Sequence, residues 1–143
     1  MDQEGPRIGV GAVVFRGSDV LVIKRGKEPF LGEWSIPGGG LLHGERLADA
    51  VRREVMEETG ISIRIGGLFG VFEALPGEGG GLRHVVMVDY WAEWTAGEPV
   101  AGDDAAAAEF VPLAEAKKRV GWDLTRGAIE AAAKLRNTVT DRP

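Results

Sequence analysis

Residues 39–61 read GGLLHGERLADAVRREVMEETGI, and the rest of the chain is organised around this stretch. Its centre, REVMEE, places Glu54, Glu57 and Glu58 at positions i, i+3 and i+4, so in a helix the three carboxylates share one face. Like charges this close destabilise a bare helix. A divalent cation offsets the repulsion, because hard ions such as Mg²⁺ take carboxylate oxygens as ligands. The alternative interpretation is a solvated acidic face.

The same stretch predicts a helix over residues 47–59. Leu47, Val51 and Val55 recur every four residues, which is typical of the buried stripe of an amphipathic helix. Gly60 follows the last helical residue and is a natural C-terminal stop. The helix is therefore expected to bury one face and to present the glutamates elsewhere.

Outward from this helix, short runs rich in apolar and β-branched residues predict strands. The strands are expected at residues 8–15 (IGVGAVVF), 20–23 (VLVI), 61–75, 84–94 (HVVMVDYWAEW) and 109–113 (EFVPL). Turns or loops are predicted at residues 17–19, 26–40, 76–81 (PGEGGG) and 97–109.

Two further helices are predicted near the C-terminus. Pro112 fits the first position of a helix over residues 113–119. A last amphipathic helix covers residues 124–136, with the inward residues Leu124, Ala128, Ile129, Ala132 and Leu135. The pattern predicts an α/β (α+β) fold in which helices pack on a mixed sheet, and a single domain over residues 1–143.

The composition limits the function. The chain has 143 residues, 44% of them apolar, and a formal charge of −5. That charge disfavours binding to nucleic-acid backbones, but a local cation or metal still allows a phosphorylated small molecule. There is no cysteine, which fits the cytoplasm, and no apolar run of membrane-spanning length is present, so no membrane association is expected.

The spacing of residues 39–61 resembles the Nudix box, G-x5-E-x7-R-E-U-x-E-E-x-G-U, in which U is apolar. Gly39, Glu45, Arg53-Glu54, Val55, Glu57-Glu58, Gly60 and Ile61 fill every fixed position. WSIPGG upstream and EFVPL downstream resemble segments that commonly flank the box, so the resemblance extends over roughly residues 8–136. The resemblance implies a Nudix hydrolase with an α/β/α sandwich fold.

The resemblance also implies the roles of individual residues. The family cleaves nucleoside diphosphates linked to another moiety at a metal site formed by a loop, a helix and a loop. Glu54, Glu57 and Glu58, with the Gly39 carbonyl, are the expected ligands of Mg²⁺, for which Mn²⁺ can substitute. Glu45 and Arg53 are expected to form a supporting salt bridge that holds the loop against the helix.

One position departs from the common pattern, since Leu42 stands where the family often carries an acidic residue. An accessory ligand is therefore not expected there.

The catalytic base stays open at this stage. Glu57 or Glu58 of the box could orient the attacking water. Asp103 and Asp104 form an acidic pair in a later loop that could close over the metal, and Glu109 is a further option. Asp104 is included among the expected catalytic residues with the three box glutamates. The alternative for the Asp103–Asp104 pair is a solvated turn.

Substrate identity depends on residues outside the box. Pro76 lies 15 positions after Ile61, a spacing associated with the ADP-ribose pyrophosphatase branch of the family. Arg25 and Arg83 are candidates for phosphate contacts because arginine binds phosphate bidentately. Phe30 is a candidate for stacking on a base, as are Trp34 and Phe72, although the same rings suit a core.

We therefore expect Mg²⁺-dependent hydrolysis of a diphosphate linkage in a nucleoside diphosphate derivative, with ADP-ribose foremost, giving AMP and ribose 5-phosphate. The alternatives are a (deoxy)nucleoside triphosphate pyrophosphohydrolase and a noncatalytic module that senses a nucleotide. The resemblance leaves a homodimer open.

Overall fold

The computed structural model describes residues 5–28, 30–78 and 83–140. The elements, in chain order, are β1 (Arg7–Arg16), β2 (Asp19–Arg25), β3 (Trp34–Ser35), β4 (Gly38–Gly40), α1 (Leu47–Thr59), β5 (Ser62–Ala74), β6 (Val85–Ala96), β7 (Ala105–Pro112), α2 (Leu113–Arg119) and α3 (Asp123–Thr140).

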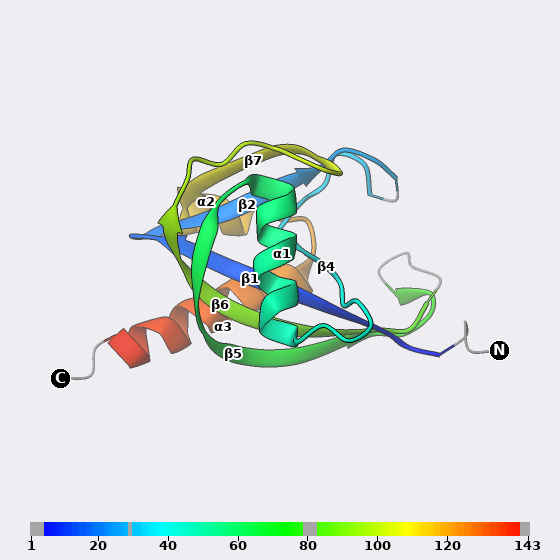
Figure 1. The fold of residues 1–143 in the computed structure, drawn as a ribbon. Helices are drawn as coiled ribbons and strands as arrows, with labels where there is room; N and C mark the ends of the chain where they lie inside the picture. Colours follow the sequence, from blue (N-terminus) through cyan, green and yellow to red (C-terminus); the bar gives the residue numbers. More distant parts are fainter. Residues whose placement is uncertain (1–4, 29, 79–82, 141–143) are drawn as a thin grey trace.

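The strands of the described residues form one mixed sheet with β1 near its centre (Figure 1). β1 runs parallel to β6 along most of its length, and β5 follows as the outer strand, antiparallel to β6. On its other edge β1 pairs with two different strands. Residues 9–11 pair with β4, whereas Phe15 and Arg16 pair with β2. β7 and β3 extend the sheet beyond β2.

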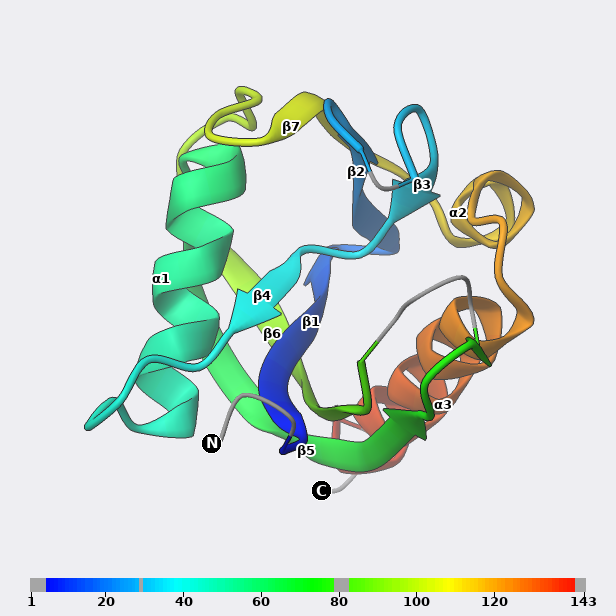
Figure 2. The ribbon, with the colours of Figure 1, turned by 90° about the vertical axis from the view of Figure 1, so that its right-hand side faces the viewer.

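Helices cover both faces of the sheet, so that α1 lies on one side and α2 and α3 on the other (Figure 2). β1 is buried on both faces because its side chains alternate between two cores. Val10, Ala12 and Val14 pack with Val51 and Val55 of α1.

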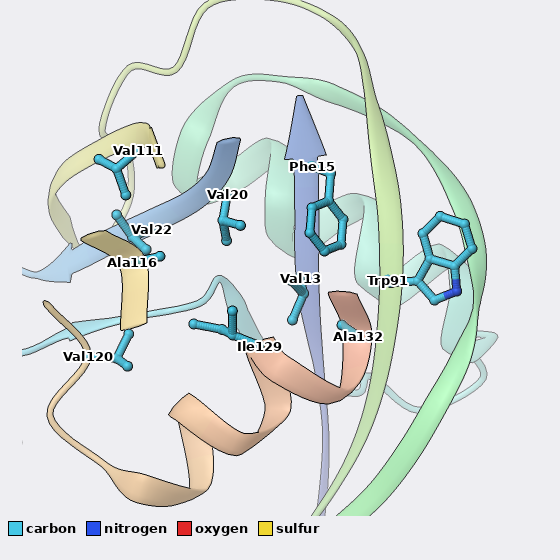
Figure 3. Packing of buried hydrophobic residues seen from close by; sticks show 10 residues of the cluster. All are labelled: Val13, Phe15, Val20, Val22, Trp91, Val111, Ala116, Val120, Ile129 and Ala132. Carbon is cyan, nitrogen blue, oxygen red and sulfur yellow. The ribbon is translucent and has the colours of Figure 1, made fainter. Parts of the chain in front are cut away.

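The second core lies under α2 and α3. Val13 and Phe15 of β1 pack there with Ile129 and Ala132 of α3 (Figure 3). The predicted α+β class with a mixed sheet is confirmed. Among the described residues, no helix is long and apolar enough to cross a membrane.

α1 has the predicted bounds, and its buried residues include Val51 and Val55. Gly60 ends it with φ 72°, and its N–H donates to the Met56 carbonyl at 2.9 Å. Glycine suits this position because a left-handed backbone costs it nothing sterically.

Three predictions about elements were wrong. Residues 26–40 were expected in a loop, yet residues 34–35 and 38–40 form the short strands β3 and β4. Residues 105–108 were expected in a loop, yet they open β7 and pair with residues 23–25 of β2. Leu124 was expected to face the core, but its side chain is 48% exposed, because it sits at the start of α3 beside a cavity. Residues 79–81 of the predicted PGEGGG turn lie outside the described residues.

Candidate active site

The loop before α1 lies very close to the helix. β4 brings residues 38–40 against β1, and the Gly38 N–H donates to Glu58 Oε1 at 2.9 Å. A Cβ atom at Gly39 would lie 2.4 Å from the Glu54 carboxyl, and one at Gly38 would lie 2.3 Å from the Val10 carbonyl oxygen. At Gly38 the obstacle is backbone, so only glycine fits there, whereas a side chain at Gly39 would force the Glu54 carboxyl to move. The backbone of Gly39 is therefore brought directly beside a box glutamate.

Arg53 joins this loop to the helix. Its Nε donates to Glu45 Oε2 at 2.7 Å and its Nη2 to the Gly40 carbonyl at 2.9 Å. Glu45 in turn accepts the Leu42 N–H at 3.1 Å. The Arg53 guanidinium also reaches Glu54 at 2.9 Å and Glu57 at 3.2 Å. Arg53 therefore holds the loop and also sets the positions of two of the candidate ligands.

The electrostatics follow from these contacts. The hydrogen bond from Arg53 holds the pKa of Glu45 below its usual range, and the same bond raises the pKa of Arg53. Burial raises the pKa of Glu54, although Arg53 opposes the shift.

Glu58 is only 8% exposed, and burial raises its pKa to about 7, with the charges of Glu54 and Asp103 adding to the effect. The Gly38 N–H and the charge of Arg25 act in the opposite direction. Glu58 is thus poised to exchange a proton near neutral pH. The last turn of α1 carries no basic residue, so no positive side chain there offsets the negative end of the helix dipole.

A later loop brings a further carboxylate to this end of α1. The Val100 and Gly102 N–H groups donate to the carbonyls of Thr59 and Glu58 at 2.9 and 3.0 Å. These bonds satisfy carbonyl groups that a helix end leaves unpaired. They place Asp103 where its charge raises the pKa of Glu54 and Glu58.

Asp104 lies differently from its neighbour. Its carboxylate pairs with Lys27 Nζ at 3.1 Å, while its backbone carbonyl accepts the Gly26 N–H. The structure therefore points to Asp103, rather than the expected Asp104, as the loop residue next to the box. The other option, Glu109, forms an ion pair with Arg119.

The donor set fits a hard divalent cation. The acidic side chains Glu45, Glu54, Glu57, Glu58 and Asp103 gather around Arg53 and Arg25, which leaves an excess of negative charge. All the donors are oxygens, as Mg²⁺ prefers. Among the described residues, no three His, Asp or Glu side chains are already arranged to hold a metal ion, because Glu54 and Glu57 contact Arg53. Their side chains must turn toward a cation for it to bind.

A cavity of about 360 Å³ opens beside the carboxylates. Glu58 and Gly39 line it, and so do the three predicted substrate-binding residues, Arg25, Arg83 and Phe30. Phe72 lies on the cavity as well, whereas Trp34 packs against the core beneath Arg119. The structure thus gathers residues from distant parts of the sequence around one space.

Sequence reasoning missed several residues of this cavity, and two of them, Trp122 and Asp89, bear on ligand binding. Trp122 meets Phe30 edge to face, with ring centroids 5.0 Å apart. Asp89 of β6 is buried on the cavity floor. A carboxylate flanked by apolar residues in the run HVVMVDYWAEW was the available signal for Asp89. Trp122 had none, because its place depends on how α3 packs.

Backbone conformation marks the same region. Among the described residues, the non-glycine residues with positive φ are Phe30, at 68°, and Asp103, at 53°. Such conformations cost energy and tend to persist at functional sites. Both residues lie at the candidate site, one on the cavity and one beside the box.

The chain belongs to the Nudix hydrolase family. The NUDIX domain family matches residues 5–132. A solved structure of a MutT NUDIX hydrolase from Burkholderia pseudomallei is 32% identical, with a TM-score of 0.75, over 90% of this chain and 98% of that chain.

Two further relatives extend the comparison. An ADP-ribose pyrophosphatase from Methanocaldococcus jannaschii is 36% identical over 76% of this chain and 63% of its own length. The NUDIX domain of NrtR from Shewanella oneidensis, complexed with ADP ribose, has a TM-score of 0.78 at 24% identity, over 92% of this chain and 89% of that chain, which is a likeness of fold. The chain spans less than two thirds of the length of the curated relatives it matches first.

Proposed function

We propose that the protein hydrolyses the diphosphate linkage of a nucleoside diphosphate derivative, with ADP-ribose foremost, giving AMP and ribose 5-phosphate. The observation that carries this proposal is the cavity. It joins Glu58 and Gly39 of the box to two arginines and an aromatic ring within one space. That combination suits a ligand with a polyanionic part and a flat part.

In this proposal Glu54, Glu57 and Glu58, with the Gly39 carbonyl, hold Mg²⁺, and Mn²⁺ can replace it. The bound cation would neutralise charge on the diphosphate and activate water. Arg53 and Glu45 keep the ligands in register with the loop. Arg25 and Arg83 bind phosphate oxygens, and Glu58 or Asp103 takes the proton of the attacking water.

The relatives support the choice of substrate. The Methanocaldococcus protein is an ADP-ribose pyrophosphatase, and the Shewanella domain was solved with ADP ribose. The single domain, the homodimer and the cytoplasmic location stay predictions.

The test is product release from ADP-ribose, NADH, dATP and dGTP, with Mg²⁺, with Mn²⁺ and with EDTA. We expect AMP from ADP-ribose only when a divalent cation is present. Glu57→Gln should cost several orders of magnitude in kcat, since it removes a ligand charge. Glu130→Gln, which changes an exposed carboxylate of α3 that does not line the cavity, should change kcat little.

Different failures carry different meanings. If no phosphoanhydride is cleaved under any of these conditions, the proposed hydrolase activity is wrong, and a nucleotide-sensing module becomes the better hypothesis. A preference for the triphosphates would overturn the substrate alone. Near-normal activity of Glu57→Gln would remove its assigned role.

A further inference from the structure

Asp89 is a buried carboxylate, and one of its oxygens has no hydrogen-bond partner among the described residues. Its side chain is 6% exposed, and that oxygen is Oδ1. Burial raises the pKa of Asp89 to about 6, and neither a hydrogen bond nor a neighbouring cation opposes that shift. An unsatisfied buried polar group destabilises a fold, so its persistence calls for an explanation.

The sheet clears space around this side chain. In the register of the strands, Asp89 lies opposite Gly11 on β1 and opposite Gly70 on β5. A Cβ atom at Gly11 would lie 2.6 Å from Asp89 Oδ1. Directly opposite Asp89, both flanking strands therefore present a glycine, and the Phe72 ring of β5 lies over Gly70. Asp89 lines the cavity.

The apolar walls of this cavity suit a flat ring. The edge-to-face pair of Phe30 and Trp122 lines the cavity, and so do Phe72 and Leu124. Arg25 and Glu58 line the same cavity and mark its polar part. Aromatic walls bind a heteroaromatic ring by stacking, and a carboxylate fixes such a ring by accepting an N–H donor.

We propose that Asp89 is a specificity-determining residue that accepts a hydrogen bond from an amino group on the substrate's nucleobase. The inference rests on the proposed function in so far as the ligand is a nucleotide. It adds that the cavity prefers a base with an exocyclic amino group, such as adenine, over the same base without that group. The ligand then supplies a donor to the Asp89 carboxylate.

Binding of a nucleotide product tests this inference apart from catalysis. Calorimetry would compare AMP with purine riboside 5′-monophosphate, which lacks only the amino group, in the absence of metal. We expect wild type to bind AMP roughly 10- to 100-fold more tightly, the usual range for a hydrogen bond to a charged group. Asp89→Leu, similar in shape but without polar atoms, should reduce the ratio to near one.

Two variants serve as controls. Asp89→Asn keeps an acceptor oxygen and should retain part of the preference for AMP. Glu73→Gln removes a carboxylate that also lines the cavity but is exposed and paired with His84 at 2.8 Å, so it should leave the ratio unchanged. Thermal melting shows that each variant is folded, and Asp89→Leu should melt no lower than wild type because it removes an unpartnered charge.

The outcomes separate the two proposals. Equal binding of the two monophosphates by wild type, or no binding of either, overturns the role of Asp89. A ratio that persists in Asp89→Leu overturns it as well. Cation-dependent cleavage of ADP-ribose would stand in all of these cases, whereas selective AMP binding without any cleavage would overturn only the hydrolase proposal.

Discussion

Arg53 determines the geometry of the box, because one guanidinium contacts Glu45, Glu54, Glu57 and the Gly40 carbonyl. Lysine offers a point charge in place of a planar fork and cannot keep these contacts together. We expect Arg53→Lys to lower kcat/KM about 10- to 100-fold and to weaken Mg²⁺ binding, because substitutions of residues that orient metal ligands have effects of this size. Steady-state kinetics at several Mg²⁺ concentrations would measure both effects.

The neighbouring Arg52 provides the matched control. It is exposed and pairs with Asp49 at 3.0 Å, and such surface pairs contribute little. Arg52→Lys should therefore keep kcat/KM within about twofold of wild type. Equal behaviour of the two variants would contradict the role assigned to Arg53.

Asp89 should make stability depend on pH. Because its pKa is raised in the folded state, the folded protein holds the proton more tightly than the unfolded chain, and this stabilisation is present below the ordinary pKa of 3.8. It is lost as the pH rises through about 6. The shift corresponds to roughly 3 kcal/mol at most.

Asp89→Asn should accordingly gain stability over wild type between about pH 4 and about pH 6, with a constant advantage above that range. Urea unfolding at about pH 4, 5 and 7.5 would measure the difference. An advantage independent of pH would show that the charge of Asp89 is not what destabilises the fold.

For single residues, the sequence predicted the arrangement of side chains within α1 and the loop before it. Glu54, Glu57 and Glu58 share a face because their spacing matches the helical repeat, so distance along the chain reports distance in space. Asp89 and Trp122 meet the same ligand space only through the pairing of β6 and the packing of α3. No local pattern encodes those contacts.

Among the elements, the contact between α1 and the loop of residues 97–104 positions Asp103. A Cβ atom at Gly102 would lie 2.7 Å from the Glu57 carbonyl oxygen, which is backbone and cannot turn aside. Gly102→Ala should therefore push the loop off the helix end. We expect a loss of about 1–3 kcal/mol in the free energy of unfolding, together with lower activity, measured by urea unfolding and kinetics.

Gly127 of α3 is the control for this substitution. A Cβ atom there would meet nothing within 4 Å, and alanine favours a helix. Gly127→Ala should stabilise the protein by about 0.5–1 kcal/mol and leave the activity unchanged. Similar losses in both variants would argue against a specific role for the loop contact.

Elements with a strong repeat were predicted with correct bounds, as α1 shows. β7 was predicted too short because residues 105–108 are alanines, which carry little preference for strand. Their strand forms because β2 offers an edge to pair with, and that edge is a tertiary feature.

The proposed metal site predicts that Mg²⁺ stabilises the molecule as a whole. The cation would bind the box carboxylates only in the folded state, where they otherwise repel one another. The gain in melting temperature should be larger at about pH 8 than at about pH 6, since the raised pKa of Glu58, about 7, makes protons compete with the metal. Differential scanning fluorimetry would measure it, with K⁺ at matched ionic strength as the control. A shift equal at both pH values, or equal for K⁺, would contradict a carboxylate metal site.

The parallel pairing of β1 with β6 has a consequence for synthesis of the chain. Residues 7–15 emerge early, but their partners at residues 85–93 follow only after α1 and β5. The helix with its glutamates can form while the chain is still growing, because its contacts are local. The floor of the cavity cannot form at that stage, because Gly11 lies on β1 and Asp89 on β6, and β6 is synthesised later. A nascent chain that stops before β6 would thus carry the complete box and lack the cavity floor.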